Sequence, residues 1–147
     1  MITCSKYYGD IPFAHRQHLH PGPCSRIHGH NWAIKITFAC SHFDNNGFVV
    51  DFGNLKYIKE YFDEHLDHAC IFSNHDPLAH SIISSSPKGI FKPYWVDNAS
   101  CEGIAQHLYL KISELVEANE GNRVWINELE LHEDEKNSVR LTPVRNK

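Results

Sequence analysis

The sequence predicts an α+β fold, in which an antiparallel sheet carries helices on one face. Alternating apolar residues mark strands near both ends of the chain, helical spacing marks two segments between them, and a tight polar turn joins the last two strands. The chain has 147 residues, 41% hydrophobic and 22% charged, which is ordinary for one globular domain. We therefore expect a single domain over residues 1–147.

Four segments are expected to form strands. Residues 2–16 alternate imperfectly and predict an opening strand that is interrupted near Gly9 and Asp10. Residues 28–40 alternate most clearly, since one face would carry Trp32, Ile34, Ile36 and Phe38. Residues 123–134 and 138–143 predict two more strands around the turn "EKN".

Two segments have the spacing of helices. Residues 51–66 place Leu55, Ile58, Phe62 and Leu66 on one stripe, with Asp51 or Asn54 available to cap the first turn. Residues 100–119 predict a second helix that ends near Gly121. Between them, residues 73–97 hold three prolines and a glycine, and so long a connection is usually functional, an interface, or mobile.

Charge and cysteine usage narrow the class of protein. A net charge of −4 argues against a general nucleic-acid binder, and no apolar run approaches the length of a membrane span. The first residues lack the apolar core of a secretion signal. The five cysteines are odd in number and scattered, which favours free thiols in a reducing compartment. We expect a cytoplasmic protein with neither a nucleic-acid nor a membrane partner.

A metal site is predicted where the clearest strand begins. His28 and His30 project from one face of that strand with stems roughly 6.5–7 Å apart, so both can bind one ion. His15 is the best third ligand because it shares the phase of Ile11 and Phe13. Three imidazoles with an open position are typical of catalytic zinc, whereas Cys24 as a fourth ligand would close a structural site. The histidines could also be plain core or surface residues.

Two further residues stand out by their surroundings. Cys24 lies in the Pro/Gly loop "PGPCSR" near the candidate cation, and a nearby positive charge favours a reactive thiolate. Glu133 shares the phase of Leu129 and Leu131, so it points inward unless a bulge at the strand end breaks the alternation. An inward carboxylate needs hydrogen-bond partners, because burying it without them is costly.

Five ordered motifs then point to a family. "FAHRQH", "CSRIHGHNW", "VVDFGNLK", "HLDHACIF" and "ELHEDEKNSVRL" resemble the motifs of the 6-pyruvoyl-tetrahydropterin and 6-carboxytetrahydropterin synthases over almost the whole chain. The resemblance implies a tunnelling fold, with a four-stranded antiparallel sheet and two helices on one face. It also implies a homo-oligomeric barrel of trimers that pair into hexamers, with active sites between subunits.

The resemblance assigns roles residue by residue. It implies zinc ligands at His15, His28 and His30, a thiol base at Cys24, and a carboxylate at Glu133 that anchors the pterin and helps the proton relay. It also implies a general acid–base pair at Asp67 and His68; from the sequence alone this pair could equally be a solvated helix end. Further pterin contacts fall on Ser100 and Cys101, where the family often has two hydroxyl residues.

The implied reaction converts 7,8-dihydroneopterin triphosphate, a small-molecule pterin, into 6-carboxy-5,6,7,8-tetrahydropterin with release of acetaldehyde and triphosphate, a step toward queuosine. The same scaffold could instead make the 6-pyruvoyl product and release triphosphate only. A third possibility is a pterin-binding module whose zinc is not catalytic. The triphosphate would need cations, for which Arg16, Arg26, His18 and His20 lie near the predicted metal in sequence.

Overall fold

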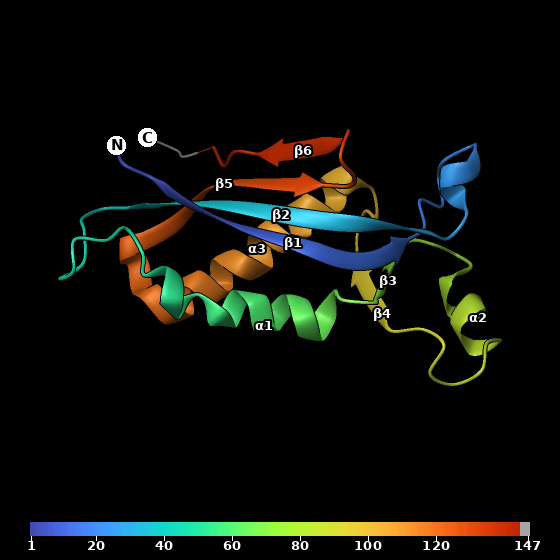
Figure 1. The fold of residues 1–147 in the computed structure, drawn as a ribbon. Helices are drawn as coiled ribbons and strands as arrows, with labels where there is room; N and C mark the ends of the chain where they lie inside the picture. Colours follow the sequence, from blue (N-terminus) through green and yellow to red (C-terminus); the bar gives the residue numbers. More distant parts are fainter. Residues whose placement is uncertain (145–147) are drawn as a thin grey trace.

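The computed structural model describes residues 1–144 and contains one six-stranded sheet, in the order β4-β3-β1-β2-β5-β6 (Figure 1). β1 pairs with β2, β2 with β5 and β5 with β6 in antiparallel fashion, while β3 lies parallel to β1 and to β4. The strands are β1 (Cys4–His15), β2 (His28–Cys40), β3 (Cys70–Ser73), β4 (Pro93–Val96), β5 (Val124–His132) and β6 (Ser138–Leu141).

Two helices cover one face of this sheet, as predicted. α1 (Lys56–His65) and α3 (Cys101–Glu120) lie side by side beneath the long strands, and the short α2 (Ala79–Ser84) stands at one end of the molecule (Figure 1). Three 3₁₀ turns complete the order, namely η1 (Pro23–Ser25), η2 (Phe52–Asn54) and η3 (Gly121–Arg123). The predicted α+β class is confirmed.

Residues 73–97 are more regular than the sequence predicted. They contain α2 and β4, and β4 together with β3 extends the expected four-stranded antiparallel sheet by two short parallel strands. A small apolar cluster holds this extension to the sheet, with Cys70, Phe72 and Ala79 at its centre. The segment is therefore a packed part of the fold.

One of the two predicted helices begins later than the sequence predicted, and the other begins as predicted. Asp51 does cap a turn, because its carboxylate accepts the Gly53 N–H at 2.9 Å, but that turn is η2, and α1 begins later, at Lys56. The second helix follows the prediction closely. Ser100 caps α3 by accepting the Gly103 N–H at 3.1 Å, and Gly121 ends the helix with φ 68°.

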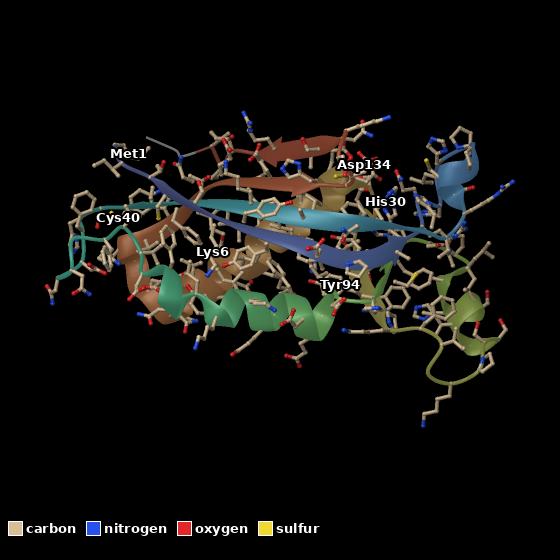
Figure 2. The ribbon with its side chains drawn as sticks, in the orientation of Figure 1. Met1, Lys6, His30, Cys40, Tyr94 and Asp134 are labelled. Carbon is tan, nitrogen blue, oxygen red and sulfur yellow. The ribbon has the colours of Figure 1, made fainter. Side chains whose placement is uncertain are left out.

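The core forms beneath the central strands. The face of β2 that carries Trp32, Ile34, Ile36 and Phe38 is fully buried, as its alternation predicted. β1 is irregular between Tyr8 and Ile11, where the predicted interruption falls. His30 and Asp134 lie toward one end of the sheet, and Cys40 and Met1 toward the other (Figure 2). Within residues 1–144, we find no helix with the length and apolarity that crossing a membrane requires.

Candidate metal centre and active site

Strand pairing brings three histidines together at one end of the sheet. His15 ends β1 and lies opposite His28, the first residue of β2, while Phe13 lies opposite His30. Because residues two apart on a strand share a face, all three imidazoles project to the same side. Their ring centroids lie 4.6, 5.6 and 5.1 Å apart, and the buried Trp32 meets the rings of His15 and His30 edge-on.

Backbone carbonyls orient two of these rings. His15 donates its Nδ1–H to the Ala99 carbonyl at 2.7 Å, and His28 donates its Nδ1–H to the Arg26 carbonyl at 2.7 Å. A carbonyl can only accept, so Nδ1 carries a proton in both rings, and Nε2 is the nitrogen with the lone pair whenever the ring is neutral. Burial lowers the pKa of His15 to about 4, which keeps that imidazole neutral near pH 7. Both Nε2 atoms are thus prepared to bind a cation.

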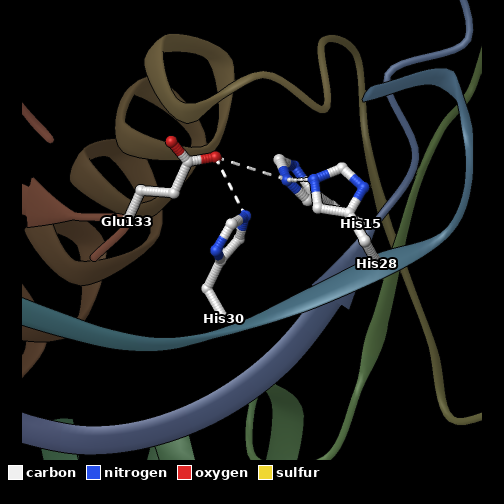
Figure 3. Close-up of side chains that lie close together, drawn as sticks. All are labelled: His15, His28, His30 and Glu133. Carbon is white, nitrogen blue, oxygen red and sulfur yellow. Dashed lines mark hydrogen bonds and ion pairs between the residues drawn. The ribbon is translucent and has the colours of Figure 1, made fainter. Parts of the chain in front are cut away.

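The free nitrogens converge on one point, together with a carboxylate (Figure 3). The Nε2 atoms of His15 and His28 are 3.1 Å apart, although both are acceptors. Glu133 Oε1 lies 3.2 Å from His30 Nε2 and 3.5 Å from His15 Nε2. One ligand atom from each of the four residues falls within 4.8 Å of the others. Two lone pairs facing each other at this distance would repel unless a cation lies between them.

These distances fit a zinc-sized ion. Four ligands bonded to tetrahedral zinc at about 2.0–2.1 Å stand about 3.3 Å from one another. Three of the six separations, at 3.1, 3.2 and 3.5 Å, are close to that value, and all six are within 4.8 Å. Apart from the ion-pair contact with Glu133 at 3.2 Å, the buried His30 Nε2 has no hydrogen-bond partner among residues 1–144, which suits a metal ligand. The donor set of three imidazoles and a carboxylate therefore suits zinc.

Cys24 does not belong to this group of four. It is half-buried in η1, and its carbonyl accepts the Gln17 N–H at 3.2 Å. The fourth ligand atom near the histidines comes from Glu133. The structure thus gives no support to a closed zinc site with Cys24 as the fourth ligand.

Comparison with known proteins identifies the family. The family model described as 6-pyruvoyl tetrahydropterin synthase matches residues 6–143. The chain belongs to this family. A 6-carboxy-5,6,7,8-tetrahydropterin synthase of Rickettsia felis is 30% identical over 135 residues, which cover 90% of this chain and 94% of the relative. A protein of the same description from Rickettsia bellii is 34% identical over 110 residues, or 74% of this chain and 78% of the relative.

Solved structures agree on the fold. An uncharacterised protein of Wolinella succinogenes superposes with a TM-score of 0.79 at 19% identity, over 96% of this chain and 97% of its own. The 6-pyruvoyl tetrahydropterin synthase of Caenorhabditis elegans gives a TM-score of 0.65 at 20% identity, over 97% and 96% of the two chains. These structures confirm the predicted tunnelling fold. By its family match and its relatives, the molecule is a pterin synthase of this family, with a histidine and glutamate group that could bind a metal ion.

In this pterin synthase, Asp67 and His68 form a pair of their own. His68 Nδ1 lies 2.7 Å from Asp67 Oδ1, just after α1, and the His68 side chain is 81% exposed. His68 adopts φ 61°, and its N–H donates to the Pro12 carbonyl at 2.7 Å, which fixes the turn. Within residues 1–144 its imidazole has no partner besides Asp67. The structure does not bring this pair into the metal group of the same chain.

The other residues that were predicted to bind the substrate have the following surroundings in the structure. Ser100 is the N-cap of α3, and its hydroxyl oxygen accepts a hydrogen bond from the Gly103 N–H. The Cys101 thiol donates to the Leu131 carbonyl at 3.7 Å, and burial raises its pKa to about 12, so it stays protonated. Arg26 is exposed, and its carbonyl holds His28. Arg16 is engaged by Asp76 at 2.8 Å, which argues against its predicted use for the triphosphate.

Two hollows contain residues that the sequence assigned to the site. One, of about 480 Å³, is lined by Glu133 and Cys101 together with residues that the sequence did not single out, namely Gln17, Glu102, Lys136, Asn137, Ser138 and Val139. The other, of about 720 Å³, includes His18, His20, His75 and Ser100. Neither could be foreseen, because each joins segments from distant parts of the sequence.

Proposed function

We propose that this chain converts 7,8-dihydroneopterin triphosphate into 6-carboxy-5,6,7,8-tetrahydropterin, releasing acetaldehyde and triphosphate, in the route to queuosine. Two lines support the proposal. The relatives in Rickettsia, at 30% and 34% identity, carry the 6-carboxy description. The single structural observation that carries it is the group of His15, His28 and His30, whose free nitrogens face one point beside a hollow.

Zinc held by these three imidazoles would act as a Lewis acid on the side-chain hydroxyls of the substrate. The protein would supply the rest. The hydrogen bonds from Nδ1 of His15 and His28 orient those two rings, and Trp32 closes the apolar side of the site. Trp32 would thereby keep water out of that side of the site.

Glu133 is proposed to anchor the pterin. Its carboxylate lines the hollow of about 480 Å³ and is 22% exposed at the side chain, so a ligand can reach it. The amino group and neighbouring ring N–H of a pterin would donate two parallel hydrogen bonds to such a carboxylate. The same contact would select heterocycles with that donor edge.

Proton transfer is assigned to Cys24, Asp67 and His68. The Cys24 thiolate would take a proton from the substrate side chain, and His68, oriented by Asp67, would exchange protons with the hydroxyl oxygens. Since the Asp67–His68 pair places no ligand atom in the metal group of its own chain, we propose that a second subunit supplies it. The active form would then be a homo-oligomer built from trimers, a hexamer, acting in the cytoplasm where thiols stay reduced.

One assay tests the proposed function against its rivals. Zinc-loaded protein is incubated with 7,8-dihydroneopterin triphosphate, and both triphosphate and acetaldehyde are measured. Release of both is the expected result, and a His30→Ala variant should release neither because it lacks a ligand. Triphosphate without acetaldehyde would indicate the 6-pyruvoyl reaction. Neither product from the wild-type protein would contradict the proposal and indicate a binding module.

A further inference from the structure

Arg16 connects two segments that are far apart in the sequence. It directly follows the predicted ligand His15, and its guanidinium donates from Nε to Asp76 Oδ2 at 2.8 Å and from Nη2 to Asp76 Oδ1 at 3.4 Å. The remaining nitrogen, Nη1, donates to the carbonyl of Ser25, the residue after Cys24. A planar guanidinium can hold a carboxylate on one edge and a carbonyl on another, which an ammonium group cannot do in the same way.

Asp76 gives this guanidinium a fixed support. The residue is only 5% exposed, and its Oδ1 also accepts the Leu78 N–H at 3.0 Å. Its own N–H donates to the Ser73 carbonyl at 3.1 Å, at the end of β3. A buried carboxylate is stable only when charged or hydrogen-bonding groups surround it, and Arg16 is the cation that does so here. Asp76 therefore ties Arg16 to the segment that follows β3.

The loop that carries Cys24 is held at three successive carbonyls. The Cys24 carbonyl accepts the Gln17 N–H at 3.2 Å, the Ser25 carbonyl accepts Arg16, and the Arg26 carbonyl accepts His28 Nδ1–H at 2.7 Å. Two donors are neighbours of His15 in sequence and the third is itself a predicted zinc ligand. The loop is only a 3₁₀ turn with no buried residue, so these bonds fix its position.

We propose that the Arg16–Asp76 pair positions the Cys24 loop against the histidine group. This role rests on the proposed function, because it matters to catalysis only if the Cys24 thiol transfers a proton. A displacement of about 1 Å between a catalytic group and its substrate can cost a hundredfold in rate. Arg16 and Asp76 are thus positioning residues. Through them, the segment of residues 73–78 holds the Cys24 loop in place without contacting the substrate itself.

Arg16→Lys is the most direct test, since it keeps a positive charge for Asp76 but loses the forked contact to Ser25. We expect kcat to fall at least tenfold, with KM changed less than twofold and zinc content unchanged. Amide hydrogen exchange at residues 23–26 should become faster. Asp76→Asn should act in the same way. The double variant should be no worse than the more damaging single one, because both remove the same contact.

Controls separate positioning from plain destabilisation. Ile112→Val removes a buried methyl group in α3, far along the chain from the loop, and should lower stability without altering kcat or exchange at residues 23–26. Wild-type kcat and exchange in Arg16→Lys would overturn the inference. Cys24→Ser tests the underlying role by itself. If it keeps full turnover, the thiol's role fails, while the exchange data still decide whether the pair holds the loop.

Discussion

At the metal group, two backbone carbonyls decide which ring nitrogens can bind an ion. Ala99 and Arg26 each accept an Nδ1–H, so the Nε2 atoms of His15 and His28 face each other as acceptors at 3.1 Å. Glu133 joins them through Oε1. The alternation of residues along the strand predicted that Glu133 points inward. It did not predict that the Glu133 carboxylate lies beside the three imidazoles. Glu133 therefore lies where it can contact either the ion or the substrate.

Glu133→Gln distinguishes these two contacts. If Glu133 anchors the pterin, the variant keeps its zinc, while KM rises by roughly ten- to a hundredfold because a charge-assisted pair of hydrogen bonds is lost. Zinc content by elemental analysis and steady-state kinetics measure the two effects. Glu130→Gln is the matched control, since Glu130 sits on the opposite face and pairs with Arg140 at 2.9 Å. Loss of zinc in Glu133→Gln alone would make the residue a ligand.

Buried histidines should make the metal-free protein sensitive to acid. Burial lowers the pKa of His15 from 6.5 to about 4, and burial also lowers the pKa of His107. Below pH 6.5, His15 becomes protonated in the unfolded chain but stays neutral in the folded chain. Its contribution to the free energy of unfolding is therefore fully present above pH 6.5 and is lost as the pH falls toward 4.

The urea midpoint of the metal-free protein should accordingly fall between about pH 7 and pH 5. His107→Gln removes one of the two histidines with a lowered pKa, so the pH dependence of the midpoint should become weaker. A midpoint that stays constant over this range in both proteins would mean that neither imidazole is kept neutral by the fold.

At the scale of elements, the start of α3 holds the site in place. Ala99, which orients His15, precedes the cap residue Ser100, and Gly103 packs against the same turn. A Cβ on Gly103 would lie 2.1 Å from the Asn98 carbonyl oxygen, far inside van der Waals contact. The glycine is thus required by the close approach of the turn to the helix.

Gly103→Ala should push this turn away from the helix. We expect a loss of at least about 2 kcal/mol in the free energy of unfolding, in the range of overpacked cores, together with weaker zinc binding through the Ala99–His15 contact. Chemical denaturation and zinc titration measure the two effects. Gln106→Ala, an exposed change in the same helix, should alter neither. A Gly103→Ala protein with wild-type stability and zinc affinity would refute this role of the turn.

The elements that the sequence predicted well are those with unbroken periodicity. β2 and α3 follow their apolar patterns almost residue for residue. β3 and β4 were not predicted because they lack such periodicity. β3 is buried at all four residues, so it shows no alternation, and β4 is short and begins with a proline. The histidine group was predictable from local strand phase. The Arg16–Asp76 pair was not, because it joins residues 60 positions apart.

At the scale of the whole molecule, the separation of Asp67 and His68 from the metal group predicts sites shared between subunits. Cys24→Ala and His68→Ala should each abolish turnover as pure oligomers. When the two inactive proteins are unfolded together and refolded, mixed oligomers should recover activity, because some sites combine an intact Cys24 with an intact His68. Mixing Cys24→Ala with His30→Ala should recover none, since both residues belong to one chain's part of the site. Recovery in neither mixture would place all the groups within one subunit.

Three imidazoles are expected to bind the ion while the sulfur of Cys24 stays unbonded. X-ray absorption spectroscopy on the zinc-loaded protein tests it directly, because zinc–sulfur bonds of about 2.3 Å are well resolved from zinc–nitrogen and zinc–oxygen bonds of about 2.0–2.1 Å. We predict a first shell of nitrogen and oxygen only, and the same spectrum for Cys24→Ala. A sulfur ligand at about 2.3 Å that disappears in Cys24→Ala would contradict the claim.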